Sequence, residues 1–239
     1  METPPAIEEE RRYEASTIQS KNIFARVAQR SRIFKAVKLS LRELKDGKLL
    51  DYGCGTGVFV HVINSLKNNI AIGYEPYQKG RFNKNVSIAS DFLDVQKHAP
   101  FQCITIFETI EHLNNEDFEE FLLRTDSILS EDGVILMSVP IEIGLGLLVK
   151  EIYRSKGNFL YHKEYTLLEL IKAAILGMPG SRIVNNGGYS SHKGFDFRKL
   201  LHDLKGRGYE AKIIAYTPFP IKTWYINSQC FIRAKKRYT

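Results

Sequence analysis

The strongest constraint on the fold is a short segment in which an apolar run passes directly into closely spaced glycines. Residues 48–52 read Lys-Leu-Leu-Asp-Tyr, and residues 53–57 read Gly-Cys-Gly-Thr-Gly. Glycine permits positive φ and lets the backbone approach a ligand without a Cβ in the way. A helical pattern follows over residues 57–66, and a helix start offers free N–H groups. The segment therefore predicts a buried strand, a ligand-binding turn and a helix, in that order.

An acidic residue further along the chain strengthens this interpretation. A second apolar run, residues 70–74, ends at Glu75, which lies 22 residues after Gly53. An acid about 20 residues after such a loop accepts hydrogen bonds from ribose hydroxyls. A carboxylate would repel a 2′-phosphate, so we expect a ligand whose ribose carries free hydroxyl groups. The third glycine comes one residue earlier than in the dinucleotide pattern Gly-x-Gly-x-x-Gly, which disfavours nicotinamide cofactors.

Strand and helix patterns alternate along most of the chain. Strands are expected at 48–52, 70–74, 86–89, 103–107, 134–139, 210–216 and 229–234. Helices are expected at 57–66, 115–129 and 197–205, and the second of these should end at Asp132-Gly133. An amphipathic helical region begins near Asn22 and closes at Asp46-Gly47. The alternation predicts an α/β protein: a Rossmann-like, seven-stranded, mostly parallel sheet with N-terminal helices.

The alternation stops at Pro140, where a segment of about fifty residues begins. It contains two helical stretches, near residues 147–153 and 167–175, with joints rich in Gly, Pro and Asn. A connection of this length is usually functional. We therefore predict a helical cap inserted after the fifth strand, over residues 141–191. Residues 1–45 would form an N-terminal tail and helices, and residues 46–239 a single domain that contains this cap.

The glycine segment resembles the first motif of class I S-adenosylmethionine-dependent methyltransferases, and the resemblance extends over residues 45–142. It implies that residues 46–239 form a methyltransferase domain and that S-adenosyl-L-methionine is the cofactor. The methionine part would be held by the strand end and loop, namely Asp51, Gly53, Cys54, Gly55 and Gly57. Glu75 would bind the ribose and Asp91 the adenine amino group. Phe92 would lie beside the adenine ring, and Phe107 would line the other side of the cofactor.

A Glu-x-x-Glu-His cluster follows the fourth strand, where the carboxyl end of a strand faces the ligand in this fold. It comprises Glu108, Glu111 and His112. In one interpretation His112, oriented by Glu111, is the general base that removes a hydroxyl proton. In another, the spacing is similar to that of ubiquinone-pathway O-methyltransferases and small-RNA 2′-O-methyltransferases. That similarity implies a divalent metal held with a later histidine, His162 or His192. In a third, the two glutamates only stabilise the start of a helix.

Charge and cysteine usage limit the partners and the compartment. Residues 21–48 hold nine lysines and arginines against two acids, and the whole chain carries a net charge of +7. A nucleic acid or another polyanion is one explanation, and a solvated helix face is the plainer one. The three cysteines, Cys54, Cys103 and Cys230, are not spaced as metal pairs, which favours free thiols in a reducing compartment. With no secretory signal or membrane-spanning run, we expect a cytoplasmic protein.

These patterns favour an enzyme that transfers methyl groups to oxygen. No Asn/Asp-Pro-Pro-type signature for exocyclic amines follows the fourth strand, which favours oxygen as the acceptor atom. The acceptor would be a small metabolite, a sugar or a lipid-linked glycan precursor. Either His162 or His192 could reach the acceptor from the cap. Two alternatives remain: an RNA 2′-O-methyltransferase, supported by the basic N-terminal region, and a non-catalytic cofactor-binding subunit. The apolar stretches near residues 144–149 and 167–175 are core, a lipid-facing patch or a homodimer contact.

Overall fold

The computed structural model describes residues 23–68, 70–77, 86–154, 164–185, 188–189 and 191–237. The chain divides into two compact units. The first unit contains the chain up to Phe107 together with residues 127–136. The second unit contains residues 108–126 and 137–239. The chain therefore passes between the units three times, first at the peptide bond that joins Phe107 to Glu108.

Seven strands form one sheet in the order β3-β2-β1-β4-β5-β9-β8. Their bounds are β1 Leu49–Tyr52, β2 Ala71–Tyr74, β3 Ile88–Ala89, β4 Phe101–Phe107, β5 Leu129–Pro140, β8 Tyr209–Thr217 and β9 Gln229–Lys236. β1 pairs in parallel with β2 and with β4, and β8 pairs antiparallel with β9. The strand order reverses on either side of β1, and ligands bind at the carboxyl ends of strands at such a reversal. This mostly parallel sheet confirms the predicted Rossmann-like α/β class.

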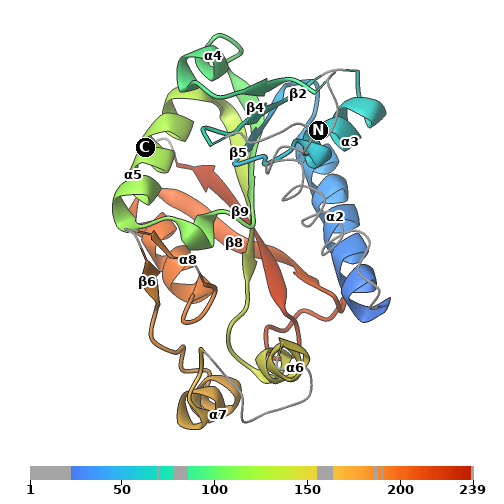
Figure 1. The fold of residues 1–239 in the computed structure, drawn as a ribbon. Coiled ribbons are helices and arrows are strands. Elements are labelled where there is room, and N and C mark those ends of the chain that lie inside the picture. Colours follow the sequence, from blue (N-terminus) through green and yellow to red (C-terminus); the bar gives the residue numbers. More distant parts are fainter. Residues whose placement is uncertain are drawn as a thin grey trace, which may run out of the picture. The chain divides into compact units, whose positions relative to one another are not determined.

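Among the described residues of the first unit, three helices pack around its strands. They are α2 Ile23–Glu43, α3 Val58–Leu66 and α4 Phe92–Gln96. α3 packs on β2, α2 packs on α3 and β4, and α4 packs on β2 and β3 (Figure 1). Leu49, Leu50, Val60, Ile63 and Ile104 are fully buried between these elements. The long apolar stretches of β1 and β4 follow from this burial, since strands covered on both faces lose the alternation of apolar and polar residues.

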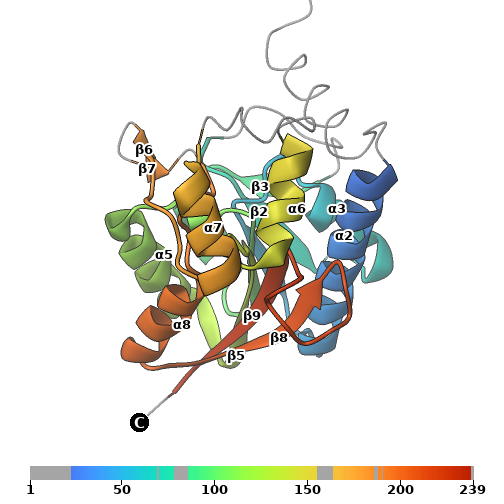
Figure 2. The same ribbon diagram turned by 90° about the horizontal axis from the view of Figure 1, so that it is seen from below.

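The second unit contains the other helices of the described ranges and the antiparallel strand pair. Its helices are η1 Ile110–His112, α5 Asn115–Ile128, α6 Leu145–Arg154, α7 Leu167–Leu176 and α8 Phe197–Gly206. α6 packs against α7 and α8 against β8 (Figure 2). A small core of Leu147, Tyr165, Leu170 and Ala173 joins the helix pair. Two short strands, β6 Val184–Asn185 and β7 Gly188–Tyr189, form a separate antiparallel hairpin, and β7 contacts η1.

The structure corrects several expected boundaries. α5 ends at Ile128, and Asp132-Gly133 lies inside β5 instead of ending the helix. β5 is longer than expected because its first residues, although polar, still pair in the sheet. α2 ends at Glu43, before Asp46-Gly47. Three short elements were not predicted, α4, η1 and the β6–β7 hairpin, because they are too short to show a hydrophobic period.

Both helical stretches expected in the segment after the fifth strand are present, as α6 and α7. The division into residues 1–45, 46–239 and a cap at 141–191 stays a prediction, and residues 1–22 lie outside the described part of the chain. Within the described ranges, no helix combines the length and apolar character needed to cross a lipid bilayer.

Candidate active site

The cofactor loop, residues 53–57 between β1 and α3, is shaped by hydrogen bonds to the end of β2. The amides of Gly53 and Cys54 donate to the carbonyl of Tyr74 at 2.8 and 3.2 Å. Gly57 has a φ of 84°, and a Cβ there would lie 2.7 Å from Cγ1 of Val86. Glycine is needed at residue 57 for two separate reasons, the left-handed backbone and the close approach of the Val86 and Ile88 side chains.

Cys54 fills the space under the cofactor loop. A Cβ on Gly73 of β2 would lie only 2.4 Å from the Cys54 sulfur, so the thiol occupies the place of the missing side chain. Burial, and then the nearby charges of Asp51 and Glu75, raise the pKa of the Cys54 thiol well above its usual range. The thiol therefore stays protonated at neutral pH and serves as a packing group.

Asp51 lies at the end of β1 with only 4% of its surface exposed. The hydroxyl of Thr105 on β4 donates to Asp51 Oδ1 at 2.6 Å. Burial raises the pKa of Asp51 to about 7; the hydrogen bond from Thr105 opposes this increase, and the nearby charge of Glu75 adds a smaller one. A buried carboxylate held in this way is suited to a cationic ligand group, which would restore its charge.

Glu75, directly after β2, braces the cofactor loop from the other side. Its Oε2 accepts from the Gly55 amide at 3.0 Å, and its Oε1 accepts from the Tyr77 amide at 3.2 Å. A Cβ added to Gly55 would meet no atom within 4 Å, so the backbone is open to a ligand at this residue. The bracing of the loop was not predicted from the sequence, which assigned Glu75 only to the ribose.

The remaining residues predicted for the cofactor lie at strand ends of the first unit. Asp91 caps α4, where its Oδ1 accepts from the Leu93 amide at 2.9 Å. The ring of Phe92 lies 5.6 Å from that of Tyr74 in an edge-on contact. Phe107, the last residue of β4, makes a similar contact at 5.1 Å with Phe59 of α3. Two aromatic rings and a carboxylate at these strand ends suit a flat heteroaromatic ligand.

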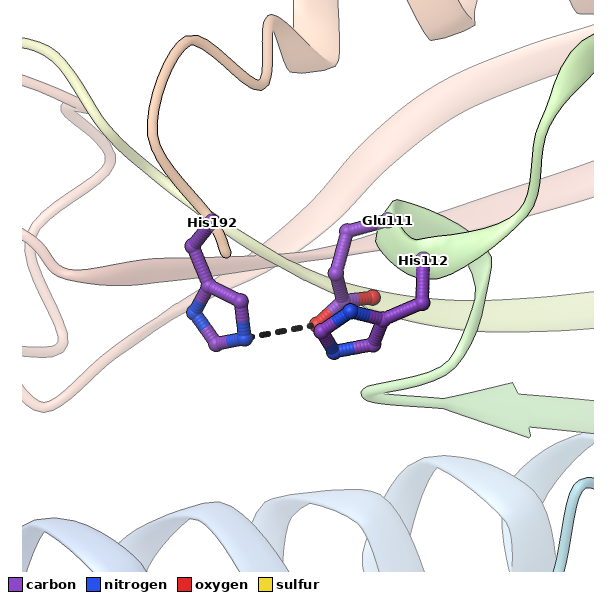
Figure 3. Close-up of side chains that lie close together, drawn as sticks. All are labelled: Glu111, His112 and His192. Carbon is purple, nitrogen blue, oxygen red and sulfur yellow. Dashed lines mark ion pairs between the residues drawn. The ribbon is translucent and has the colours of Figure 1, made fainter. Parts of the chain in front are cut away.

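The second unit gathers an acid and two histidines into one cluster, which we call the acid–histidine cluster: Glu111, His112 and His192 (Figure 3). One ligand atom from each lies within 4.8 Å of the others, and no second group of this kind occurs among the described residues. Nε2 of His192 is 3.6 Å from Oε1 of Glu111. Glu111 is fully buried, whereas both histidines are partly exposed.

A backbone hydrogen bond fixes the tautomer of His112. Its Nδ1 lies 2.7 Å from the carbonyl oxygen of Tyr189 on β7. A carbonyl can only accept, so the proton of the neutral ring is on Nδ1. The lone pair is then on Nε2, which is free to accept a proton or to bind a metal ion. Neither the contact nor its partner, 77 residues away, is visible in the sequence.

The segment that carries His192 is anchored at the start of α7. Lys193 Nζ pairs with Glu169 Oε2 at 2.9 Å, and Ser191 donates to Glu164 Oε2 at 2.8 Å. Glu169 also forms a capping box with Thr166. The hydrogen bond from the Thr166 amide and then the one from Lys193 lower the pKa of Glu169 to about 2. The anchor is therefore charged at any physiological pH.

Glu108 stands apart from the acid–histidine cluster. Its carboxylate accepts from the Ser138 hydroxyl at 3.0 Å and from the side-chain amide of Gln229. Its φ is 51°, in the left-handed region that is unfavourable for a non-glycine residue. The structure thus brings together Glu111, His112 and His192 and directs Glu108 elsewhere. His162 lies outside the described residues.

This arrangement defines a class of protein. A glycine loop after β1, an acid after β2 and the reversal of strand order at β1 are the marks of a Rossmann-like fold that binds an adenosine-type ligand. Residues 24–203 match the family described as Methyltransferase domain. The chain belongs to this family.

Individual relatives are more distant. Over 112 residues, 43% of this chain and 45% of the relative, the chain is 27% identical to the ubiquinone biosynthesis O-methyltransferase of Pelagibacter ubique (strain HTCC1062). The match thus spans less than half of that relative's length. Among solved structures, magnesium protoporphyrin IX methyltransferase from Synechocystis PCC 6803 with bound SAH superimposes with a TM-score of 0.55 at 10% identity, covering 98% of this chain and 95% of that one. A SAM-dependent methyltransferase from Archaeoglobus fulgidus gives 0.56 at 15% identity, covering 95% and 99%. At such identities, the structural similarity supports the fold alone.

Proposed function

We propose that this chain is an S-adenosylmethionine-dependent O-methyltransferase whose acceptor is a small hydroxylated molecule. The observation that carries the oxygen acceptor is the fixed tautomer of His112, which leaves Nε2 as a ready proton acceptor. A hydroxyl attacks a methyl sulfonium far better once its proton is removed, whereas a neutral amine needs no base for the attack itself. The partial match to an O-methyltransferase of ubiquinone biosynthesis supports the same choice.

The residues of the first unit fit the proposed cofactor. S-adenosylmethionine would supply an electrophilic methyl group on a positively charged sulfur. Asp51 would accept from the ammonium group of the methionine part, and the open backbone at Gly55 would allow the ligand close to the cofactor loop. Glu75 would accept from the ribose hydroxyls while it keeps its bond to the Gly55 amide. Asp91 would meet the adenine amino group, with Phe92 and Phe107 beside the ring.

The acid–histidine cluster would act on the acceptor. Nε2 of His112 would take the hydroxyl proton as the oxygen–methyl bond forms and the carbon–sulfur bond breaks. The neighbouring carboxylate of Glu111 would stabilise the imidazolium that results. The remainder of the rate enhancement would come from alignment of the two reactants and exclusion of water.

The proposal can be tested with the purified protein and a methyl-labelled cofactor. Acceptors would be a series of phenols and catechols, a set of sugars, and matched anilines and thiols of the same size. Transfer to the hydroxyl compounds, lost in His112→Ala, is the expected result. Labelling of only the anilines or thiols would contradict oxygen as the acceptor atom while leaving the cofactor assignment intact.

A metal-assisted form of the same reaction is the second candidate, because one carboxylate and two imidazoles converge in the acid–histidine cluster. These donors fit a divalent transition metal, and Glu111, His112 and His192 would hold it. The ion would lower the pKa of a bound hydroxyl. Activity abolished by a chelator and restored by Mg²⁺, Mn²⁺ or Zn²⁺ would favour this form. Full activity in chelator would leave His112 as a base without metal.

The RNA alternative predicts a different acceptor and a different salt dependence. Binding of an RNA duplex or single strand should weaken steeply between about 50 and 200 mM salt if several phosphates are contacted. Labelling of small hydroxyl compounds with no salt-dependent RNA binding would remove this alternative. A chain that binds the cofactor but labels none of the acceptors, RNA included, would favour the non-catalytic subunit.

A further inference from the structure

Arg182 makes an unusual set of contacts beside the acid–histidine cluster. Its Nη2 donates to the carbonyl oxygen of Glu111 at 2.5 Å, across 71 residues of sequence. Its Nη1 lies 3.5 Å from the carbonyl oxygen of Lys193 and donates to it. One guanidinium therefore reaches the backbone of both segments that supply the cluster, η1 with Glu111 and His112, and the segment with His192.

Aromatic rings hold the same guanidinium on its faces. The guanidinium carbon lies 3.8 Å from the centroid of the Tyr189 ring and 5.5 Å from that of Phe195. Arginine suits this position because its planar group stacks on rings while its N–H groups donate in the plane. Lysine has a single ammonium head and cannot do both. Tyr189 is also the residue whose carbonyl accepts from His112 Nδ1.

We propose that Arg182 is the positioning residue of this active site: it clamps η1 to Tyr189 and to residues 191–195, so that His112 presents Nε2 and His192 stays beside Glu111. This inference rests on the proposed function for its catalytic consequence. The clamp itself does not depend on the proposed function, because Arg182 acts on backbone carbonyls and on the tautomer of His112.

The test uses the full chain with ¹⁵N-labelled histidine and two substitutions at the same residue. Arg182→Gln removes both the charge and the planar set of N–H donors, whereas Arg182→Lys keeps the charge but loses the planar donors. Arg207→Gln is the matched control, because Arg207 also lies over a ring, Phe118 at 5.4 Å, and pairs with Glu119, away from the acid–histidine cluster. Long-range ¹H–¹⁵N spectra report the tautomer of His112, calorimetry reports cofactor affinity, and labelled methyl transfer reports kcat.

We expect His112 to be protonated on Nδ1 in the wild-type protein and in the control. In Arg182→Gln and in Arg182→Lys the tautomers should mix. For both substitutions kcat should fall about 10- to 100-fold, the usual effect of losing a group that orients a site residue. Cofactor affinity should stay within about twofold, because the residues proposed to bind the cofactor belong to the other unit.

A milder variant keeps the test valid if Arg182→Gln does not fold. Tyr189→Leu removes one stacking face but leaves the carbonyl in place, and kcat should fall about threefold, as expected for a single cation–π contact. An unchanged tautomer and kcat in a folded Arg182→Gln would overturn the clamp, as would full recovery in Arg182→Lys. If the wild-type protein methylates no acceptor, the proposed function fails, and the tautomer spectra still decide the clamp.

Discussion

The cofactor loop and the acid–histidine cluster are built in opposite ways. The loop lies in the first unit, and its supports come from a short stretch of chain, β1, β2 and the residue after each. Backbone amides and missing side chains shape it. The cluster lies in the second unit and joins side chains separated by more than seventy residues. The comparison teaches that the loop is a property of local sequence, whereas the cluster is a property of the folded chain.

The largest expected effect is on kcat in His112→Ala, and it distinguishes the acid–histidine cluster from the cofactor loop. His112→Ala should lower kcat by about 10²- to 10⁴-fold, because a general base acts on the transition state. Cofactor affinity, measured by calorimetry, should hardly change. His202→Ala, at an exposed position on α8, is the matched control and should retain full activity. Full activity in His112→Ala would leave the cluster without the proposed role.

Glu75 tests whether one side chain does both tasks assigned to it in the loop. Glu75→Ala should weaken cofactor binding by about 1.5–3 kcal/mol, since it removes a charged acceptor. Glu75→Gln keeps an oxygen for the Gly55 amide and should lose less. Calorimetry on both variants gives the difference, which isolates the charge. Equal, near-wild-type affinities would refute the ribose assignment.

The free energy of unfolding of Gly57→Ala tests whether the loop needs a glycine at this residue. Gly57→Ala places a Cβ against Val86 and Ile88 at a φ of 84°, and Gly208→Ala has the same φ with no atom within 4 Å. Both substitutions carry the strain of the left-handed conformation, so their difference is the overlap. We expect Gly57→Ala to be destabilised by about 1–3 kcal/mol beyond the control. Chemical denaturation of the two variants measures this, and equal losses would show that the loop can relax.

The smallest effect concerns pH. Because the pKa of Asp51 is raised to about 7, its carboxyl is largely protonated at pH 6 and largely ionised at pH 8. Only the ionised form attracts a cationic group, so cofactor affinity should rise about tenfold from pH 6 to pH 8. Calorimetry at the two pH values should show the rise in the wild-type protein and a flat profile in Asp51→Asn. A rise that persists in Asp51→Asn would assign the titration to another group.

The extent of prediction from sequence follows the same division. The longer strands of the seven-stranded sheet and the helices α3, α6, α7 and α8 were predicted because their apolar residues form clear runs or recur with a clear period. Asp51 and Glu75 could be singled out because one lies near the end of β1, just before the glycines, and the other directly follows β2; their roles toward the cofactor stay predictions. The roles of Thr105 and Arg182 were not predicted, although a hydroxyl inside the apolar run of β4 was a signal for Thr105. Nothing near Arg182 in sequence indicates that its partners are Glu111 and Tyr189.

The three passages of the chain between its units have a consequence for how such an enzyme can be recombined. A chimera in which only residues 137–239 came from another methyltransferase would replace His192 and Arg182 but keep Glu111 and His112 of this chain. Half of the cluster would then face a clamp selected for another partner. To exchange the acceptor specificity, a chimera therefore has to take both residues 108–126 and residues 137–239 from the same source protein. The loop residues 53–57 can stay unchanged.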